Sequence, residues 1–301
     1  MKYRILAAVA PSAGSEEFNQ LLRQQGLLVH EDGVLVPSGF GLLLFGRTPR
    51  NAVPQAGLLA RADLADGSFV RKEFGEALVL IPGLLEEWLK TVLPSTIDRS
   101  QMQREERVDL PFEMIREAVV NALIHRDYEI AGQKCQLVVN ADTITVKSPG
   151  GPIPPVSLAQ LQSFSAPMKS RNPVLHYVFA RMGMAEEQGF GLKLGLKNEA
   201  ERLGLPLPTF AMEGDYLVLT IFRSKAAAIS GLGNEVLGAL TQSEKVGWKW
   251  LATRNDVTSA EYAEAMEIPS RTALNHLRHL TEFGLLVKTG GGRSTRYEVV
   301  R

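Results

Sequence analysis

A helix that carries two polar side chains on one face is the feature that most restricts how this chain folds. From Glu117 to Tyr128 the sequence is mostly apolar with helical spacing, and Glu117 and Asn121 stand four residues apart. Side chains four apart lie on the same face of a helix. A carboxylate there can orient or deprotonate a water, and an amide oxygen can complete the shell of a hard divalent cation. The pair therefore indicates either such a site or a solvated polar pair on an amphipathic helix.

Two glycine-rich segments follow this helix. Residues 148–151 (Ser-Pro-Gly-Gly) come after a strand-like run, and Gly189 and Gly191 precede another helical run. Glycine lets a backbone approach a ligand closely, and the start of a helix offers free N–H groups at a positive dipole end. The second segment is interpreted as a phosphate cradle. It is not a dinucleotide fingerprint, because the next glycine, Gly195, comes one residue late.

The order of these motifs resembles the GHKL (Bergerat) ATP-binding fold. More narrowly, the segments REAVVNALIHRDY, SPGGPIP, SRNPVL and EEQGFGLKL resemble the divergent GHKL-like domain of bacterial Schlafen/AlbA-type transcriptional regulators, which are often labelled as RecG-like helicases. The resemblance extends from about Phe18 to Phe222. It implies an α+β chain whose GHKL-like α/β sandwich has a mixed sheet with helices on one face.

The resemblance also assigns roles to individual residues. Glu117 becomes the catalytic base, and Asn121 the ligand of Mg²⁺. Ser148 stands where GHKL enzymes carry an aspartate for the adenine amino group, and the alternative there is a tight turn after an edge strand. Loop residues Lys169, Arg171 and Asn172 either touch phosphates from a lid or belong to a solvated loop. The residues expected to bind ATP are Asn121, His125, Ser148, Gly150, Gly151, Lys169, Arg171, Gly189, Gly191 and Leu192.

His125 belongs to a short charged run at the end of the helix. His125, Arg126 and Asp127 either reach a phosphate or a partner chain, or they complement the helix dipole as C-terminal charges. The residue types do not decide between these interpretations.

The end of the chain resembles a winged helix, with a helix–turn–helix followed by a hairpin. Ser259 is expected to cap one helix, and the next helix, over residues 271–283, is expected to bury Leu274. Residues 269–301 have a net charge of +4, although the whole chain has 33 basic and 33 acidic residues. Contacts with double-stranded DNA are expected from Ser270, Arg271, Thr272, Asn275, Arg278, Arg293 and Arg296. A protein-docking or dimerisation role is the alternative.

The sequence divides into four expected parts. They are an α/β connector region (1–107) that follows an absent AlbA-like domain, the GHKL-like domain (108–224), an Ala/Ser/Gly-rich linker (225–233) and the winged helix (234–301). Strands are expected at 34–36, 58–64, 136–139, 143–146 and 215–222, the last closing the sheet. Helices are expected at 18–28, with Gly26 as the stop, and at 39–46, 76–92, 173–182 and 192–203.

Composition limits the class of protein. Cys135 is the only cysteine, which fits a reducing cytoplasm. No run approaches the ~20 apolar residues of a membrane span, and no G-x-x-x-x-G-K-[ST] loop supports a P-loop helicase. We therefore predict a homodimeric, DNA-binding transcription regulator whose GHKL-like domain binds, or once bound, ATP and Mg²⁺. The alternatives are an ATPase, at most a weak one, acting with DNA in repair or defence, and a degenerate fold serving as a dimerisation scaffold.

Overall fold

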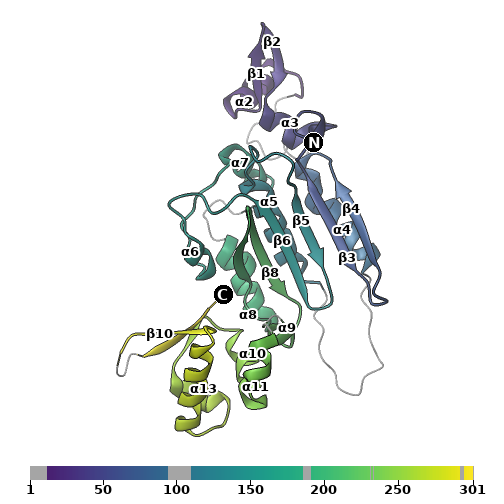
Figure 1. Ribbon diagram of the computed structural model, residues 1–301. Coiled ribbons are helices and arrows are strands. Elements are labelled where there is room, and N and C mark those ends of the chain that lie inside the picture. The colour runs from purple at the N-terminus through teal and green to yellow at the C-terminus, as the bar shows by residue number, and fades with distance from the viewer. Residues whose placement is uncertain are drawn as a thin grey trace.

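One six-stranded sheet organises most of the molecule (Figure 1). The computed structural model describes residues 12–93, 110–185, 191–230, 232, 234–291 and 295–300. The strands lie in the order β4-β3-β5-β6-β8-β7, and every pair is antiparallel except β3 with β5. Their bounds are β3 Leu58–Asp63, β4 Phe69–Phe74, β5 Cys135–Val139, β6 Thr143–Pro149, β7 Thr209–Glu213 and β8 Tyr216–Phe222.

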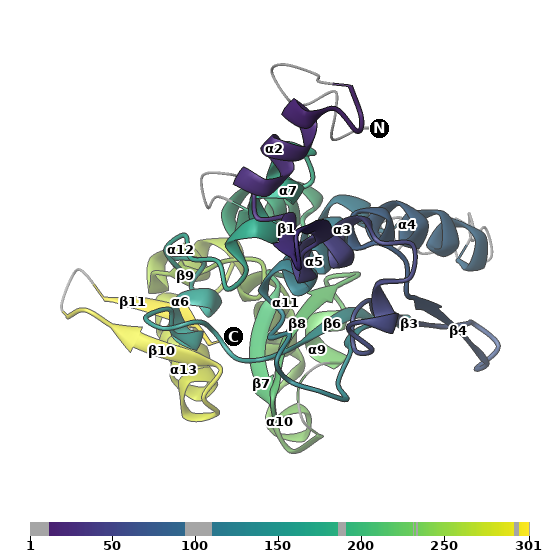
Figure 2. The same ribbon diagram turned by 90° about the horizontal axis from the view of Figure 1, so that it is seen from above.

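Helices cover one face of this sheet. In β5, Cys135, Leu137 and Val139 are buried and the residues between them are half-buried, because successive side chains point to opposite faces. Helices α4 (Ile81–Val92) and α5 (Phe112–His125) lie on one side of the strands, as Figure 2 shows from above. Helices α7 (Pro173–Arg181) and α8 (Glu199–Leu203) pack against α5. This mixed sheet with helices on one face matches the predicted fold class and is consistent with a GHKL-like fold.

Helix α5 is buried on nearly every side, which explains its apolar sequence. Nine of its 14 residues are buried, as expected for a helix enclosed between layers. Glu113 and Arg116 reach solvent and form an ion pair with each other. Glu117 lies on the buried side and is 8% exposed, so the interpretation as a solvated polar pair does not hold for it.

The sheet crosses the boundary that the sequence predicts between residues 107 and 108. Strand β3 precedes that boundary, yet it pairs in parallel with β5, and Leu58 faces Cys135 although the two are 77 residues apart in the chain. A parallel pair needs a long crossover connection, and α4 and α5 belong to it here. The region before residue 107 therefore shares one core with the predicted GHKL-like domain. The predicted polar connector at 94–107 lies outside the described residues.

Other parts of the sheet domain also differ from the expected pattern. The strand that was expected to close the sheet is β8. The edge of the sheet is instead formed by β7, because a turn at Gly214 (φ 56°) lets β7 pair with the free side of β8. The helix expected over 192–203 begins as a π-helix, η3 (Leu192–Asn198), and continues as α8. A short helix, α6 (Leu158–Gln162), lies beside β7.

A small helix–hairpin extension precedes the sheet and lies at the top of Figure 1. It contains α2 (Glu16–Gln24), β1 (Leu28–Glu31), β2 (Val34–Pro37) and α3 (Gly39–Phe45). The helix expected over 18–28, with Gly26 as its stop, covers Glu16–Gln24, and Gly26 (φ 70°) turns the chain into β1 as predicted. Two 3₁₀ turns follow at Pro49–Asn51 and Leu78–Leu80, so the helix expected from residue 76 begins at Ile81.

The C-terminal part of the chain has a core of its own. Its elements are α9 (Ala227–Ser230), α10 (Asn234–Ala239), α11 (Gln242–Leu251), β9 (Asp256–Val257), α12 (Ser259–Ala265), α13 (Ser270–Glu282), β10 (Leu286–Thr289) and β11 (Arg296–Val299). The three strands form a sheet in the order β10-β11-β9. The backbone N–H of Leu207 donates to the carbonyl oxygen of Ala252 at 2.9 Å and links this C-terminal unit to the sheet domain.

Three sequence expectations differ from the structure of the C-terminal unit. The expected linker contains helix α9, and Trp248 Nε1 donates to the carbonyl of the buried Ala228 at 3.1 Å. Thr258, one residue before Ser259, caps α12, because Thr258 and Glu261 form a reciprocal capping box. Leu274 is 41% exposed, since the core side of α13 is occupied by Ala273, Leu277 and Leu280.

Candidate functional site

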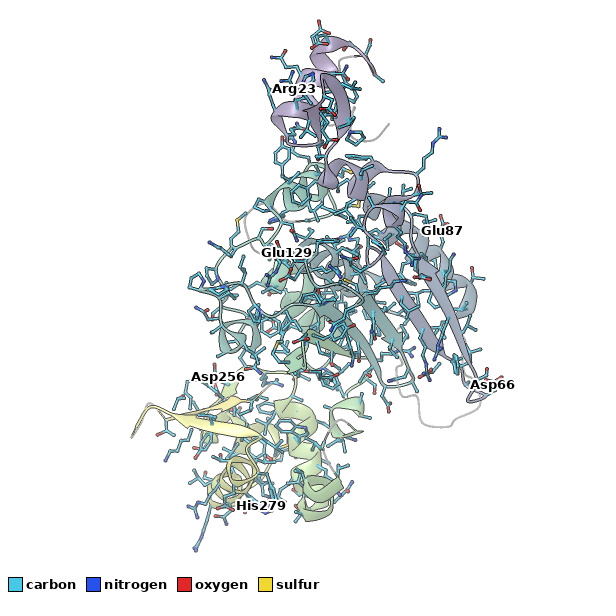
Figure 3. All side chains as sticks on the ribbon, turned by 45° about the horizontal axis from the view of Figure 1, so that its top comes forward. Arg23, Asp66, Glu87, Glu129, Asp256 and His279 are labelled. Carbon is cyan, nitrogen blue, oxygen red and sulfur yellow. The ribbon has the colours of Figure 1, made fainter. Side chains whose placement is uncertain are left out.

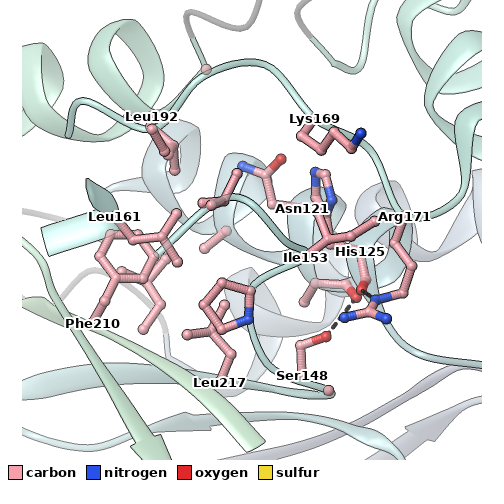
Figure 4. Close-up of a pocket in the computed structure, with 18 of the residues that line it drawn as sticks. Asn121, His125, Ser148, Ile153, Leu161, Lys169, Arg171, Leu192, Phe210 and Leu217 are labelled. Carbon is pink, nitrogen blue, oxygen red and sulfur yellow. Dashed lines mark hydrogen bonds between the residues drawn. The ribbon is translucent and has the colours of Figure 1, made fainter. Parts of the chain in front are cut away.

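A pocket opens between the polar side of α5 and the sheet (Figure 4). Its volume is about 160 Å³, close to the roughly 150 Å³ of a cavity that holds a benzene ring. Its apolar end is lined by Val146, Ile153, Leu161, Phe210, Leu217 and Leu219. Its polar end is lined by Glu117, Asn121, His125, Lys169, Arg171 and His176. Such a pocket suits a ligand with an apolar ring and a charged tail.

Asn121 and Glu117 lie together at the polar end. Asn121 Nδ2 donates to Glu117 Oε1 at 2.8 Å. This bond uses one of the two amide hydrogens and does not engage the Asn121 oxygen, which is therefore available to a ligand or a cation. Figure 4 shows this amide beside the ring of His125. Amide oxygens are among the ligands that hard cations take.

Gly191 and Gly195 lie against Glu117. A Cβ atom on Gly191 would lie 2.1 Å from Glu117 Oε1, and one on Gly195 would lie 2.8 Å from Glu117 Cγ. Glycine at both positions therefore lets η3 approach α5 this closely. Gly191 already has a helical backbone (φ −53°, ψ −44°), and Leu192 lines the pocket. Gly189, the other half of the expected phosphate cradle, lies outside the described residues.

The Ser148 hydroxyl is bonded to α5. It donates to the carbonyl oxygen of Ala122 at 2.9 Å, and the residue is buried. Its one proton is engaged in this bond, so toward a pocket ligand the oxygen can only accept. The alternative of a turn after an edge strand is wrong, because β6 pairs with both β5 and β8.

The two glycines after β6 form part of the pocket wall. Gly150 has φ 98°, and a Cβ atom there would lie 2.8 Å from Asp127 Cβ. Its N–H donates to the Asp215 carbonyl at 2.7 Å. Gly151 lines the pocket and presents its carbonyl to Arg171. A side chain at Gly150 would therefore separate this turn from the end of α5.

Arg171 connects three parts of the pocket wall. Its guanidinium donates to the His125 carbonyl at 3.1 Å and the Gly151 carbonyl at 2.8 Å, and it pairs with Asp127 at 3.1 Å. It is therefore a fixed structural group, and neither a lid charge nor a solvated loop charge describes it. Lys169, in contrast, is exposed at the mouth, with no ion-pair partner among the residues that the structure describes.

His125 is a neutral group at physiological pH. Burial, together with the nearby His176 and Arg171, lowers its pKa to about 4. This direction does not favour the alternative in which His125 complements the helix dipole as a charge. Its ring faces the pocket in Figure 4, with the ring centroid 6.3 Å from that of His176. Asn172 bonds the carbonyls of Ile124 and Arg126 at 2.7 and 2.8 Å and so closes the end of α5.

Sequence reasoning missed His176 and the apolar end of the pocket. Leu161, Phe210 and Leu217 come from α6, β7 and β8, and an apolar residue in a helix or strand carries no mark of a pocket. His176 stands in α7 directly after the SRNPVL segment, so that motif was the available signal for it.

Helix α13 presents the second candidate surface. Ser270, Arg271, Asn275 and Arg278 are exposed on it, and Thr272 is half-buried. Arg296 on β11 instead pairs with Asp256 and lies 3.7 Å from Glu261. Arg293 lies outside the described residues. The basic groups of α13 are thus open to an anion, whereas the charge of Arg296 is already compensated.

Two further features of the described residues bear on the class of site. Within the described part of the chain, no three His, Cys, Asp or Glu side chains are grouped as metal ligands. No described helix has the length and apolarity needed to cross a membrane. Cys135 is buried, and burial raises the pKa of its thiol to about 11, so the thiol stays protonated.

Comparison with known proteins supports an ATPase-like domain in the middle of the chain. Residues 132–221 match the family described as "Putative ATP-dependent DNA helicase recG C-terminal". The matched range contains β5 to β8 and most of the pocket wall. It begins after α5, so Glu117 and Asn121 fall outside it. No curated protein matches this chain.

A solved structure with a similar fold is the DIP2311 protein from Corynebacterium diphtheriae. The TM-score is 0.54 and the sequence identity is 20%, over 99% of this chain. This chain covers 60% of the DIP2311 chain. An identity this low shows a shared fold and leaves activity open.

Proposed function

We propose that this chain is a DNA-binding regulator whose sheet domain binds ATP with Mg²⁺ in the α5 pocket. The observation that carries the proposal is the Asn121–Glu117 pair at the polar end of a pocket whose other end is apolar. An adenine ring suits the apolar end. The Ser148 oxygen, which can only accept, suits an amino group. The phosphates then extend toward Lys169 at the mouth.

The donor groups of the pocket fit Mg²⁺. This ion keeps several waters and is usually held by one or two protein oxygens together with substrate phosphates. The Asn121 oxygen supplies such a ligand. When bound, the ion neutralises phosphate charge.

The packing of Glu117 favours binding over turnover. A general base must reach the water that it activates. Glu117 is 8% exposed, accepts a bond from Asn121 and lies beneath Gly191 and Gly195. We therefore propose nucleotide sensing as the main role. Slow hydrolysis is the second candidate, because Glu117 does line the pocket.

The C-terminal unit is the proposed DNA-binding part. Helices α12 and α13 with the β10–β11 hairpin have the order of a winged helix, and the exposed basic residues of α13 support a DNA contact. Homodimer formation, a cytoplasmic location and the folding of 234–301 as a separate domain remain predictions.

Calorimetry with MgATP tests the nucleotide site. Asn121→Ala removes the proposed cation ligand, so we expect its affinity to fall at least tenfold while the wild-type chain binds. Arg116→Ala is the matched control, because Arg116 is on the exposed side of the same helix. Equal affinities for wild type and Asn121→Ala would overturn the proposed ligand role. No wild-type binding at millimolar ATP would overturn the nucleotide proposal.

Substitution of two carboxylates on α5 separates sensing from hydrolysis. Glu117→Gln removes the only carboxylate among the described residues that line the pocket, and Glu113→Gln removes an exposed carboxylate four residues earlier. If phosphate release occurs in the wild type and in Glu113→Gln but not in Glu117→Gln, the hydrolase is the correct alternative. If none of the three releases phosphate, the sensing role stands.

Removing one basic group from α13 tests the DNA proposal. Arg271→Ala should weaken binding to duplex DNA and lower the slope of log affinity against log salt by about one. Arg23→Ala is the control, because it removes one exposed positive charge at the opposite end of the molecule (Figure 3). Identical affinities of Arg271→Ala and wild type at low salt would refute the contact.

A further inference from the structure

The outward face of α13 has an apolar residue at its centre. Exposed residues recur along the helix at Ser270, Arg271, Leu274, Asn275, Arg278 and Glu282. Leu274 is 41% exposed, although the residues around it are polar or charged. The exposed leucine side chain makes no hydrogen bonds with water. One such side chain has too little apolar area to form a protein-docking patch. Its position among polar groups is instead typical of a face that meets both apolar and polar atoms.

Two arginines bracket this centre. Arg271 and Arg278 are exposed, and neither has an ion-pair partner in the described part of the chain. Seven residues of helix separate them by roughly 10 Å along the axis, close to the width of about 12 Å of the major groove. The two guanidiniums can therefore contact phosphates on either side of the groove, with Leu274 and Asn275 between them facing the base edges.

Helix α13 is held rigidly from its inner side. Tyr262 Oη and His276 Nδ1 lie 3.2 Å apart, and His279 Nδ1 lies 2.7 Å from Glu244 Oε1. These bonds tie α13 to α12 and α11, so the outward side chains keep a fixed register. Figures 1 and 3 show α13 and His279 at the end of the C-terminal unit that is away from the main sheet.

We propose that Leu274 and Asn275 read A·T base pairs in the major groove. A thymine presents a methyl group there, and an adenine presents the N7 acceptor and the N6 amino donor. Asn275 can bond both adenine atoms through its amide, while Leu274 packs on the methyl of a neighbouring thymine. Arg296 adds little on the hairpin side, because Asp256 and Glu261 compensate its charge. This inference rests on the proposed DNA-binding function.

Altered bases in a selected duplex test the two contacts. A duplex is first selected from a random pool with the full chain, and then single bases are replaced. Changing a contacted thymine to deoxyuridine removes one methyl and should weaken wild-type binding about threefold. Changing a contacted adenine to 7-deazaadenine removes the N7 acceptor and should weaken it about tenfold.

The matching variants show which side chain makes each contact. Leu274→Ala should bind the thymine and deoxyuridine duplexes equally, and Asn275→Ala should bind the adenine and 7-deazaadenine duplexes equally. Val246→Ala, an exposed aliphatic residue on α11, should keep both preferences. If the variants retain the wild-type preferences, or if the selected duplexes share no A·T pair, the inference is overturned while DNA binding stands. If no duplex is retained at any salt concentration, the proposed DNA function itself fails.

Discussion

Arg126 is a positive charge buried at the end of α5. It is 0% exposed and makes no ion pair within the described part of the chain. Its guanidinium donates to the carbonyls of Asp127, Ile130 and Gln133, and it lies 4.8 Å from the centre of the Tyr128 ring. Backbone acceptors and an aromatic face thus replace a carboxylate partner. This residue fixes the loop between α5 and β5.

We expect Arg126→Met to destabilise the chain by about 3 kcal/mol, because three backbone carbonyls lose their donor in a buried place. Arg116→Met is the matched control on the exposed side of α5, with an expected change within about 0.5 kcal/mol. Urea unfolding at pH 7 measures both. A similar change in the two variants would mean that the bonds of Arg126 do not hold the loop.

The shifted pKa of His125 predicts a loss of stability in acid. The pKa is about 4 in the folded chain, and an unfolded histidine titrates near 6.5. Between these values the unfolded chain binds a proton that the folded chain does not. The free energy of unfolding is therefore unaffected by this group above about pH 6.5. It falls as the pH drops toward 4, by about 3 kcal/mol in all.

The measurement compares urea unfolding at pH 7 and pH 5. From this residue alone we expect a loss of about 2 kcal/mol between them, which His125→Gln should remove. His30→Gln, at an exposed position on β1, should leave the loss unchanged. If His125→Gln loses as much stability between pH 7 and pH 5 as the wild type does, the acid sensitivity belongs to other groups.

At the scale of elements, the close contact between η3 and α5 depends on glycine, which has no side chain, at the positions of η3 that face Glu117. Gly195→Ala would place a methyl 2.8 Å from Glu117 Cγ and 3.0 Å from its Cδ. We expect a destabilisation of about 1–3 kcal/mol from this overpacking. In a Glu117→Ala background the clashing atoms are gone, so the same change should stabilise by up to about 1 kcal/mol through helix propensity.

A double-mutant cycle on thermal or urea unfolding measures this coupling. Gly238→Ala on α10 is the control, because its new methyl meets no atom within 4 Å, and it should be neutral or stabilising in both backgrounds. Additive effects of Gly195→Ala and Glu117→Ala would show that η3 moves freely relative to α5.

Local pattern predicted the elements of this protein better than their connections. The apolar spacing of α5 and the β-rich runs around Asn140 were sufficient for the helix and for the β5–β6 hairpin. The partners of the site residues were not predictable in this way. Ser148 bonds to Ala122, and Arg171 bonds to Gly151, because the fold brings together segments that are distant in the sequence. The spacing of residues along the chain does not predict such tertiary contacts.

At the scale of the whole molecule, the charges are nearly balanced within the C-terminal unit as well. Residues 234–301 contain nine basic and eight acidic side chains. A DNA contact therefore depends on the local placement of a few cations on α13, and no overall field assists it. The sequence predicted a local basic patch, but the pairing of Arg296 on the hairpin appears only when Asp256 and Glu261 lie beside it.

The segments before and after residue 107 contribute strands to the same sheet, and this predicts how a truncated chain behaves. A fragment of residues 108–301 lacks β3 and leaves one edge of β5, with its sequence CQLVV, unpaired. We expect this fragment to aggregate, because an apolar strand edge pairs with other chains. Light scattering after size exclusion measures this, with residues 16–301 as the control. A monomeric fragment with the unfolding temperature of the control would contradict the expectation.

The parallel pair β3–β5 also has a consequence for synthesis of the protein in the cell. Leu58 leaves the ribosome 77 residues before its partner Cys135, a delay of roughly 4–15 s at bacterial rates of translation. During that interval the nascent β3–β4 hairpin exposes Leu58, Ala60 and Phe74, which are buried in the finished sheet. Until Cys135 is synthesised, that edge of β3 therefore lacks its strand partner.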